Sequence, residues 1–349
     1  MNRATLVETL ELVQPALAEP NSPVPMFQNL IFEGGQVYAY NDNLGILGPC
    51  DDQGVFAVHG KTLIGVLKNS RAEEVTFELD GNDLKVKAGK TTAKMPIFKK
   101  EEFLFEEPPA KYPAKVPLNE KSIMGIDVCL TTVSRDQSLP ALMGVTLTHD
   151  GKKARLYSCD GDAITRYGLT DTTVKKEGTF TIPTSFCEAL IRTSQKAGIA
   201  DGILEISDEW AKATLGDFTI YGRMIQNDNP LDHAKLIADS MKQKPSYVPL
   251  PKGMDDALSR ARVVSDPESA PTKLTVKDGK LIMLTETHMG VVRDSMVVRG
   301  AHPDTEATVN ASAVQRAIKI CDEIALFENC TVYRQGDALL QVLSNMGNT

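Results

Sequence analysis

The residues of this chain that could do enzyme chemistry include two Gly-Lys-Thr triplets, which begin at Gly60 and Gly89. This triplet is the tail of a phosphate-binding loop, in which a second glycine upstream lets backbone amides wrap a phosphate. Val55 and Leu84 stand where that second glycine is required. Neither triplet can complete a phosphate-binding loop, and both are predicted to be turns beside strands.

Metal chemistry is equally weakly supported. Asp160 and Asp162 form an acidic pair, but no ladder of carboxylates follows it, as a calcium loop would need. The five histidines lack zinc-site spacing, and the acid–base pair Asp232-His233 is expected in an exposed loop. Six cysteines without a Cys-x-x-Cys pair predict neither disulfides nor zinc and are typical of a reducing cytoplasm. The sequence therefore predicts no catalysis, no metal and no cofactor.

The clearest pattern in the sequence is a repeated segment, which would position any functional residues. An apolar-alternating segment leads into an Asp-Gly or Gly-Gly turn, and a second alternating segment follows, which is typical of a β-hairpin. The three copies span 27–40, 142–157 and 274–284, with turn glycines Gly35, Gly151 and Gly279. Three copies of one hairpin predict three similar structural units.

Six stretches with helical periodicity accompany the hairpins, two in each unit. They span 5–17 and 61–70, then 120–133 and 183–192, then 253–264 and 310–320. Asn310 is placed to cap the last helix, and a Thr or Ser following Pro183 to cap the fourth. Each unit is thus predicted to contain two similar halves, each a helix followed by antiparallel strands, in an α+β fold.

Proline-rich connectors at 106–117 and 243–251 mark the seams between units. They divide the 349 residues into predicted domains 1–113, 114–241 and 242–349. No stretch approaches the roughly 20 apolar residues that span a bilayer. The N-terminal segment lacks the apolar core of a signal peptide, so a cytoplasmic location is expected.

The formal net charge of −8 argues against a protein that simply coats nucleic acid, but basic residues could still be confined to one surface. Basic residues recur at same-face spacing in the second helix of each unit. The pairs are Lys61 with Lys68, Arg192 with Lys196, and Arg316 with Lys319, extended by Arg71, Arg260 and Arg262. The alternative is that cations late in a helix only stabilise its negative end.

The order and spacing of these features resemble the bacterial sliding clamp, the beta subunit of DNA polymerase III. The resemblance is carried by Leu142-Met-Gly-Val145 with Leu156-Tyr-Ser-Cys-Asp-Gly-Asp-Ala-Ile164, by Gly216-Asp-Phe218 leading to Asn229-Pro230, and by segments 6–17 and 23–32. It implies a ring of two three-domain subunits, joined head to tail around duplex DNA. Such a ring tethers polymerases to the template and catalyses nothing.

The resemblance also implies three sets of site residues. The DNA-facing set is Lys61, Lys68, Arg71, Arg135, Gln137, Arg192, Lys196, Arg260, Arg262, Arg316 and Lys319. The pocket for short apolar peptides of polymerase and clamp-loader subunits is Leu142, Cys159, Gly161, Ile164, Pro230, Val342, Ser344 and Met346. The contacts of a head-to-tail homodimer are Phe103, Val263 and Val264.

Departures from the family pattern leave other functions open. Asp162-Ala163 and Ala234-Lys235 replace the family's His-Arg and Arg-Val pairs, so a shallower or more polar pocket is expected. Together with the weakly basic loops at 18–23 and 137–141 and the net charge, these changes keep a second hypothesis open, a clamp-fold protein-interaction scaffold that does not encircle DNA. A phosphoryl-transfer enzyme is a distant third. The substitutions indicate a divergent clamp, encoded by a bacterium or a phage.

Overall fold

The computed structural model describes residues 1–98, 108, 111–169, 177–226, 230–241, 244–266 and 270–346. They form two compact units, which are not the three repeats of the sequence. The first comprises Met1–Ile123 and Ile182–Gln226, and the second comprises the remaining described residues. No helix in these ranges is long and apolar enough to cross a membrane. Because the units are grouped by contact, the three-domain division remains a prediction.

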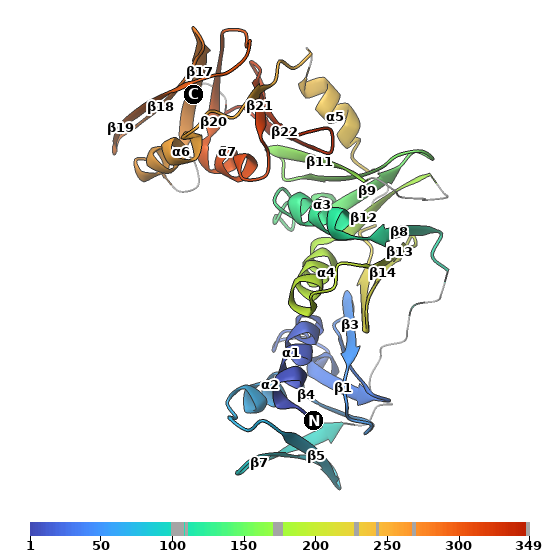
Figure 1. Cartoon of the computed structure of the whole chain (residues 1–349). Coiled ribbons are helices and arrows are strands. Elements are labelled where there is room, and N and C mark those ends of the chain that lie inside the picture. The colour runs from blue at the N-terminus through green and yellow to red at the C-terminus, as the bar shows by residue number, and fades with distance from the viewer. Residues whose placement is uncertain are drawn as a thin grey trace. The chain divides into compact units, whose positions relative to one another are not determined.

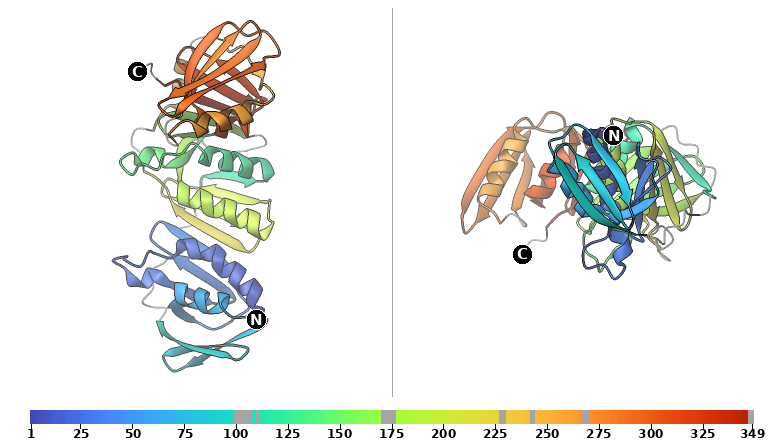
Figure 2. Two further views of the ribbon diagram at one scale, coloured as in Figure 1. Left: turned by 90° about the vertical axis from the view of Figure 1, so that its left-hand side faces the viewer. Right: turned by 90° about the horizontal axis from the view of Figure 1, so that it is seen from below.

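The first unit contains an eleven-stranded antiparallel sheet with three helices on one side (Figure 1; Figure 2, left). Its order is β5-β6-β7-β4-β1-β2-β3-β15-β14-β13-β8. The strands are β1 (Asn29–Glu33), β2 (Gln36–Tyr40), β3 (Leu44–Pro49), β4 (Phe56–His59), β5 (Val75–Asp80), β6 (Asp83–Ala88), β7 (Thr91–Phe98), β8 (Ala114–Leu118), β13 (Gly202–Ile206), β14 (Trp210–Leu215) and β15 (Phe218–Arg223). The helices are α1 (Arg3–Val13), α2 (Gly60–Lys68) and α4 (Thr184–Ala197), with short 3-10 turns η1 (Gln14–Ala16) and η2 (Pro25–Gln28).

The second unit contains two antiparallel sheets, of eight and four strands. Their orders are β12-β9-β10-β11-β23-β22-β21-β16 and β19-β18-β17-β20. The strands are β9 (Gly144–His149), β10 (Ala154–Cys159), β11 (Ala163–Leu169), β12 (Gly178–Pro183), β16 (Val248–Pro249), β17 (Pro271–Lys277), β18 (Lys280–Thr287), β19 (Gly290–Val297), β20 (Thr305–Asn310), β21 (Glu323–Leu326), β22 (Cys330–Gln335) and β23 (Leu339–Ser344). The helices are α3 (Glu120–Leu130), which begins in the first unit, α5 (His233–Ser240), α6 (Met254–Val263) and α7 (Ala311–Ile318), with the 3-10 turn η4 (Pro140–Leu142).

The three predicted hairpins are confirmed as β1–β2, β9–β10 and β17–β18. Gly35, Gly151 and Gly279 all have positive φ angles, between 70° and 79°, as tight turns require. All six predicted helices are also present. Asn310 caps α7 as expected, because its side chain accepts hydrogen bonds from the Ser312 and Ala313 amides.

Two expectations were wrong in detail. The N-cap of α4 is Pro183, with no side-chain cap bond, because the proline's extended backbone precedes a helix that already begins at Thr184. The first Gly-Lys-Thr triplet is the first turn of α2, capped by His59, and not a turn outside a helix.

The proline-rich connectors end in strands. Residues 114–118 form β8, which pairs with β13, and Val248–Pro249 form β16, which pairs with β21. Both strands are outermost in their sheets. Proline lacks the amide donor of a ladder, so it is tolerated at such edges. The described parts of both connectors thus contribute to sheet edges.

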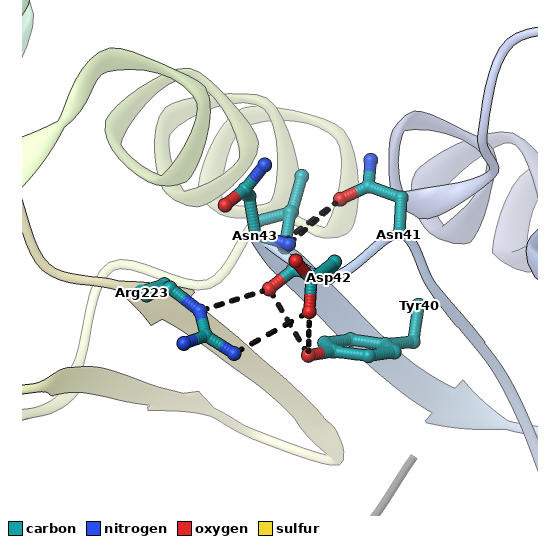
Figure 3. A network of polar contacts seen from close by, with 6 residues as sticks. Tyr40, Asn41, Asp42, Asn43 and Arg223 are labelled. Carbon is teal, nitrogen blue, oxygen red and sulfur yellow. Dashed lines mark hydrogen bonds and ion pairs between the residues drawn. The ribbon is translucent and has the colours of Figure 1, made fainter. Parts of the chain in front are cut away.

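Strands β3 and β15 join the first and second repeats into one sheet, although their paired residues lie 172 (219−47) to 178 (222−44) positions apart in the chain. The β2–β3 turn beside this joint holds Asp42 at a φ of 76°, which is unusual for a residue other than glycine (Figure 3). Arg223 on β15 donates to the Asp42 carbonyl oxygen at 3.2 Å and to its carboxylate at 3.4 Å. The Tyr40 hydroxyl donates to the same carbonyl at 3.0 Å. These bonds fasten the turn to the joint.

Candidate functional site

Helices α2 and α4 of the first unit bury one face and expose their lysines and arginines. Leu63 and Leu67 of α2, and Phe186 and Leu190 of α4, are fully buried against the sheet. All eleven residues of the predicted DNA-facing set are solvent-exposed. Exposure is required of a residue that contacts a phosphate, but it is also the ordinary state of a surface cation.

Several of these cations are engaged by carboxylates within the chain. Glu11 of α1 binds two of them, with the Lys68 Nζ 2.7 Å from its Oε1 and the Lys196 Nζ 2.9 Å from its Oε2. Hydrogen bonds from both lysines lower the pKa of Glu11 to about 2. Lys61 lies 3.3 Å from Glu19.

The third repeat shows the same arrangement. Arg260 of α6 forms two bonds with Asp294 of β19, at 2.6 and 3.2 Å. Arg262 donates to the side-chain oxygen of Gln315 at 2.7 Å. Besides Arg262, five further cations of the set form no ion pair with any described carboxylate. These are Arg71, Arg135, Arg192, Arg316 and Lys319.

The predicted peptide pocket centres on a row of three side chains in register across β10, β11 and β23. Cys159 is opposite Ile164, and Ile164 is opposite Val342. Neighbouring residues directly opposite one another point to the same face of a sheet. The Ser344 amide donates to the Asp162 carbonyl at 2.7 Å, which places Ser344 beside the turn that contains Gly161.

Helix α5 packs over this row and was not predicted. Ile237 of α5 lies in one buried cluster with Tyr157, Val332 and Val342, and Ile164 packs against its edge. Cys159 and Val342 are buried, while Ile164 is half-buried. Burial raises the pKa of the Cys159 thiol, so this residue contributes a neutral apolar surface. Of the row, Ile164 is the member that a ligand could reach.

The expectation that Asp232-His233 forms an exposed loop was wrong for His233. Asp232 accepts a hydrogen bond from the Lys235 amide and caps α5, so the helix begins at His233 and turns its ring inward. The ring is 5 % exposed and stacks on Tyr157 at 5.3 Å. Burial lowers the pKa of His233. An aspartate followed by apolar residues at helical spacing was the signal that could have revealed α5.

The remaining pocket residues are less closely tied to the row. Leu142 is half-buried at the end of η4, Pro230 is exposed, and Met346 is half-buried with its amide bonded to the Thr308 carbonyl at 2.7 Å. No hydrogen bond or strand pairing among the described residues links these three to the row. The structure thus brings together Cys159, Gly161, Ile164, Val342 and Ser344.

A buried polar network lies on the opposite face of the same three strands. The Thr132 hydroxyl, just after α3, is 2.7 Å from that of Ser158 and 2.6 Å from that of Thr165. Gln341 donates to the Thr165 hydroxyl at 2.9 Å and to the Thr131 hydroxyl at 3.3 Å. Because Ser158, Thr165 and Gln341 are the chain neighbours of the row, this network anchors the strands that present it.

Of the predicted dimer contacts, Phe103 lies outside the described residues. Val263, at the end of α6, is 78 % exposed, and Val264 is half-buried. The nearby β19 is the outermost strand of its sheet and exposes Val291 and Val297 at 61 % and 70 %. These strand residues were missed because alternation on an edge strand looks the same in the sequence whether or not a partner covers it.

Solved structures with the same fold include DNA sliding clamps. The DnaN sliding clamp of Bartonella birtlesii, solved bound to griselimycin, is 18% identical with a TM-score of 0.88, over 99% of this chain and 98% of that one. The Pseudomonas aeruginosa clamp is 17% identical with a TM-score of 0.87 over the same shares. No protein-family model and no curated protein matches the sequence.

The DNA polymerase III beta subunit of Thermotoga maritima matches in the same way, with 15% identity and a TM-score of 0.85 over 100% of this chain and 99% of that one. The chain therefore has the α+β fold of bacterial sliding clamps along its whole length. Its low identity to each of these clamps marks it as divergent in sequence.

Proposed function

We propose that this protein is a DNA sliding clamp, a non-catalytic processivity factor that encircles duplex DNA in the cytoplasm and tethers a polymerase. The observation that carries the proposal is the repetition of exposed lysines and arginines on helices of all three repeats, in a chain with the clamp fold. Contacts from such residues to the phosphate backbone bind without sequence preference and allow sliding.

The proposal includes three domains, at 1–113, 114–241 and 242–349, and a head-to-tail homodimer. The outermost strand β19, with Val291, Val297 and the adjacent Val263, supports the dimer. An edge strand with exposed apolar residues is a template for pairing with another chain, and a closed ring would cover this edge. Partner peptides would dock at the row that includes Ile164.

A second candidate is favoured by the ion pairs. Lys61, Lys68, Lys196 and Arg260 are each paired with a carboxylate of the chain, Lys68 and Lys196 with the same one. Cations engaged within the chain are expected of a clamp-fold scaffold that does not encircle DNA. The two candidates differ in topology, because only a ring is retained on a circle and lost from a free end.

The test measures retention of labelled protein on nicked circular DNA, loaded with its cognate clamp loader and ATP, before and after linearisation by a restriction enzyme. A sliding clamp elutes with the circle and is released on cutting. A surface binder stays on both forms. A scaffold stays on neither, and a solution mass of 38.0 kDa, the mass of one chain, would contradict a two-subunit ring.

A further inference from the structure

Glu11 occupies the centre of the helix layer of the first unit. Its helix α1 contacts α2 on one side and α4 on the other. Lys68 ends α2 and Lys196 lies in the last turn of α4. Each lysine binds a different oxygen of the single Glu11 carboxylate. Two cations from two repeats therefore converge on one anion, in the way that they would converge on a phosphate group.

The three groups differ in exposure. The Glu11 side chain is 21% exposed, whereas Lys68 and Lys196 are 50% and 46% exposed. The lysines can therefore swing into solvent while the carboxylate stays against the helices. Arg192, one turn before Lys196 on the same helix, forms no ion pair with a described carboxylate. The helix layer thus contains both occupied and available cations.

We propose that Glu11 acts as a resident competitor of DNA phosphate. In the free protein it holds Lys68 and Lys196, so a duplex must displace the carboxylate before either lysine can contact the backbone. The inference rests on the proposed clamp function and adds to it a residue that limits DNA affinity. A clamp must slide, and engaging two of its cations with one carboxylate weakens its grip on any one position of the duplex.

The test replaces Glu11 by glutamine (Glu11→Gln) and compares it with Glu8→Gln. Glu8 lies three residues earlier on α1, is exposed, and forms no ion pair with a described residue, so both variants change the net charge equally. Binding to a labelled duplex is measured by fluorescence anisotropy across a salt series. Two released lysines would steepen the slope of log affinity against log salt by about 1.8, at roughly 0.9 per phosphate contact.

When salt is lowered from 200 to 50 mM, this difference in slope means that the affinity of Glu11→Gln should rise about 12-fold more than the affinity of Glu8→Gln. Adding Lys68→Gln and Lys196→Gln to Glu11→Gln should restore the original slope. Equal slopes for Glu11→Gln and Glu8→Gln would overturn the inference.

A second comparison does not depend on the folding of the Glu11 variant. In the otherwise unchanged protein, Lys68→Gln should reduce DNA affinity less than Arg192→Gln does, because Lys68 is already engaged by Glu11. Equal losses would contradict the inference. If the unchanged protein is retained on circles but both comparisons fail, only the inference falls. If it binds neither duplexes nor circles, the proposed function falls and the inference with it.

Discussion

The polar network beneath the predicted peptide face gives a sharp test of how the second unit is held together. Thr165 and Gln341 are at most 1 % exposed, and they join strands of different repeats through a 2.9 Å hydrogen bond. Thr165→Val removes the acceptor and keeps the shape. The buried Gln341 amide then retains only its 3.3 Å bond to Thr131. A stranded buried donor costs about 1–3 kcal/mol of unfolding free energy.

Gln341→Leu should cost less. Like Thr165→Val it breaks two hydrogen bonds, here those to Thr165 and Thr131. It leaves no buried donor stranded, because the Thr165 hydroxyl keeps its partner Thr132 at 2.6 Å. In the double variant no amide is stranded, because both partners are replaced by apolar groups of similar shape. The double variant is therefore expected to be more stable than the sum of the single changes allows, by about 1–2 kcal/mol.

The assay is urea unfolding followed by circular dichroism. The chain's one tryptophan, Trp210, lies in the first unit, so its fluorescence does not report on the network. Thr179→Val, at an exposed position of β12 in the same sheet, is the matched control and should be near neutral. Strict additivity, or a Thr165→Val variant that is more stable than Gln341→Leu, would refute the reasoning.

Three further results are expected. Ile164→Asp combined with Met346→Asp should abolish stimulation of the cognate polymerase while the solution mass stays at about twice 38.0 kDa; a fall in mass would mean that the pocket is wrongly assigned. Val263→Glu with Val291→Glu should lower the mass to 38.0 kDa by gel filtration with light scattering, since both valines are exposed at the proposed dimer edge, and an unchanged mass would remove these residues from the interface. The folded-state pKa of Glu11 is lowered to about 2, so the stability that its ionised carboxylate contributes is present above its ordinary pKa and is lost as pH falls towards 2. The difference in unfolding free energy between the unchanged protein and Glu11→Gln, followed by acid titration, should therefore shrink across that window and stay constant above it.

The elements that the sequence predicted well are those with local signals. The hairpin around Gly279 and the Asn310 cap each depend on residues within a few positions of one another. Exposure of the basic residues also followed from helical periodicity. What these patterns could not show is where each cation's partner lies, because Glu11 and Lys196 are 185 positions apart.

The features that were missed depend on long-range pairing. Nothing near Ile164 in the sequence indicates that β11 pairs with β23, or that α5 covers the row that results. His233 was expected in solvent because an adjacent Asp-His pair is polar, yet helix capping by Asp232 turns the ring onto Tyr157. Local polarity was overridden by the apolar contacts of Ile237 on the same helix.

The pairing of β3 with β15 has a mechanical consequence. Four successive residue pairs, from Thr219 with Leu47 to Gly222 with Leu44, carry the sheet from the first repeat into the second. A load across the first unit is therefore borne by a ladder of backbone hydrogen bonds, reinforced by the Arg223–Asp42 contact, and not by a flexible tether. A hinge at this joint would require the ladder to rupture. If the proposed ring has to open to admit DNA, opening at this joint would break a ladder within the chain, whereas opening at the proposed contact between subunits would leave this sheet intact.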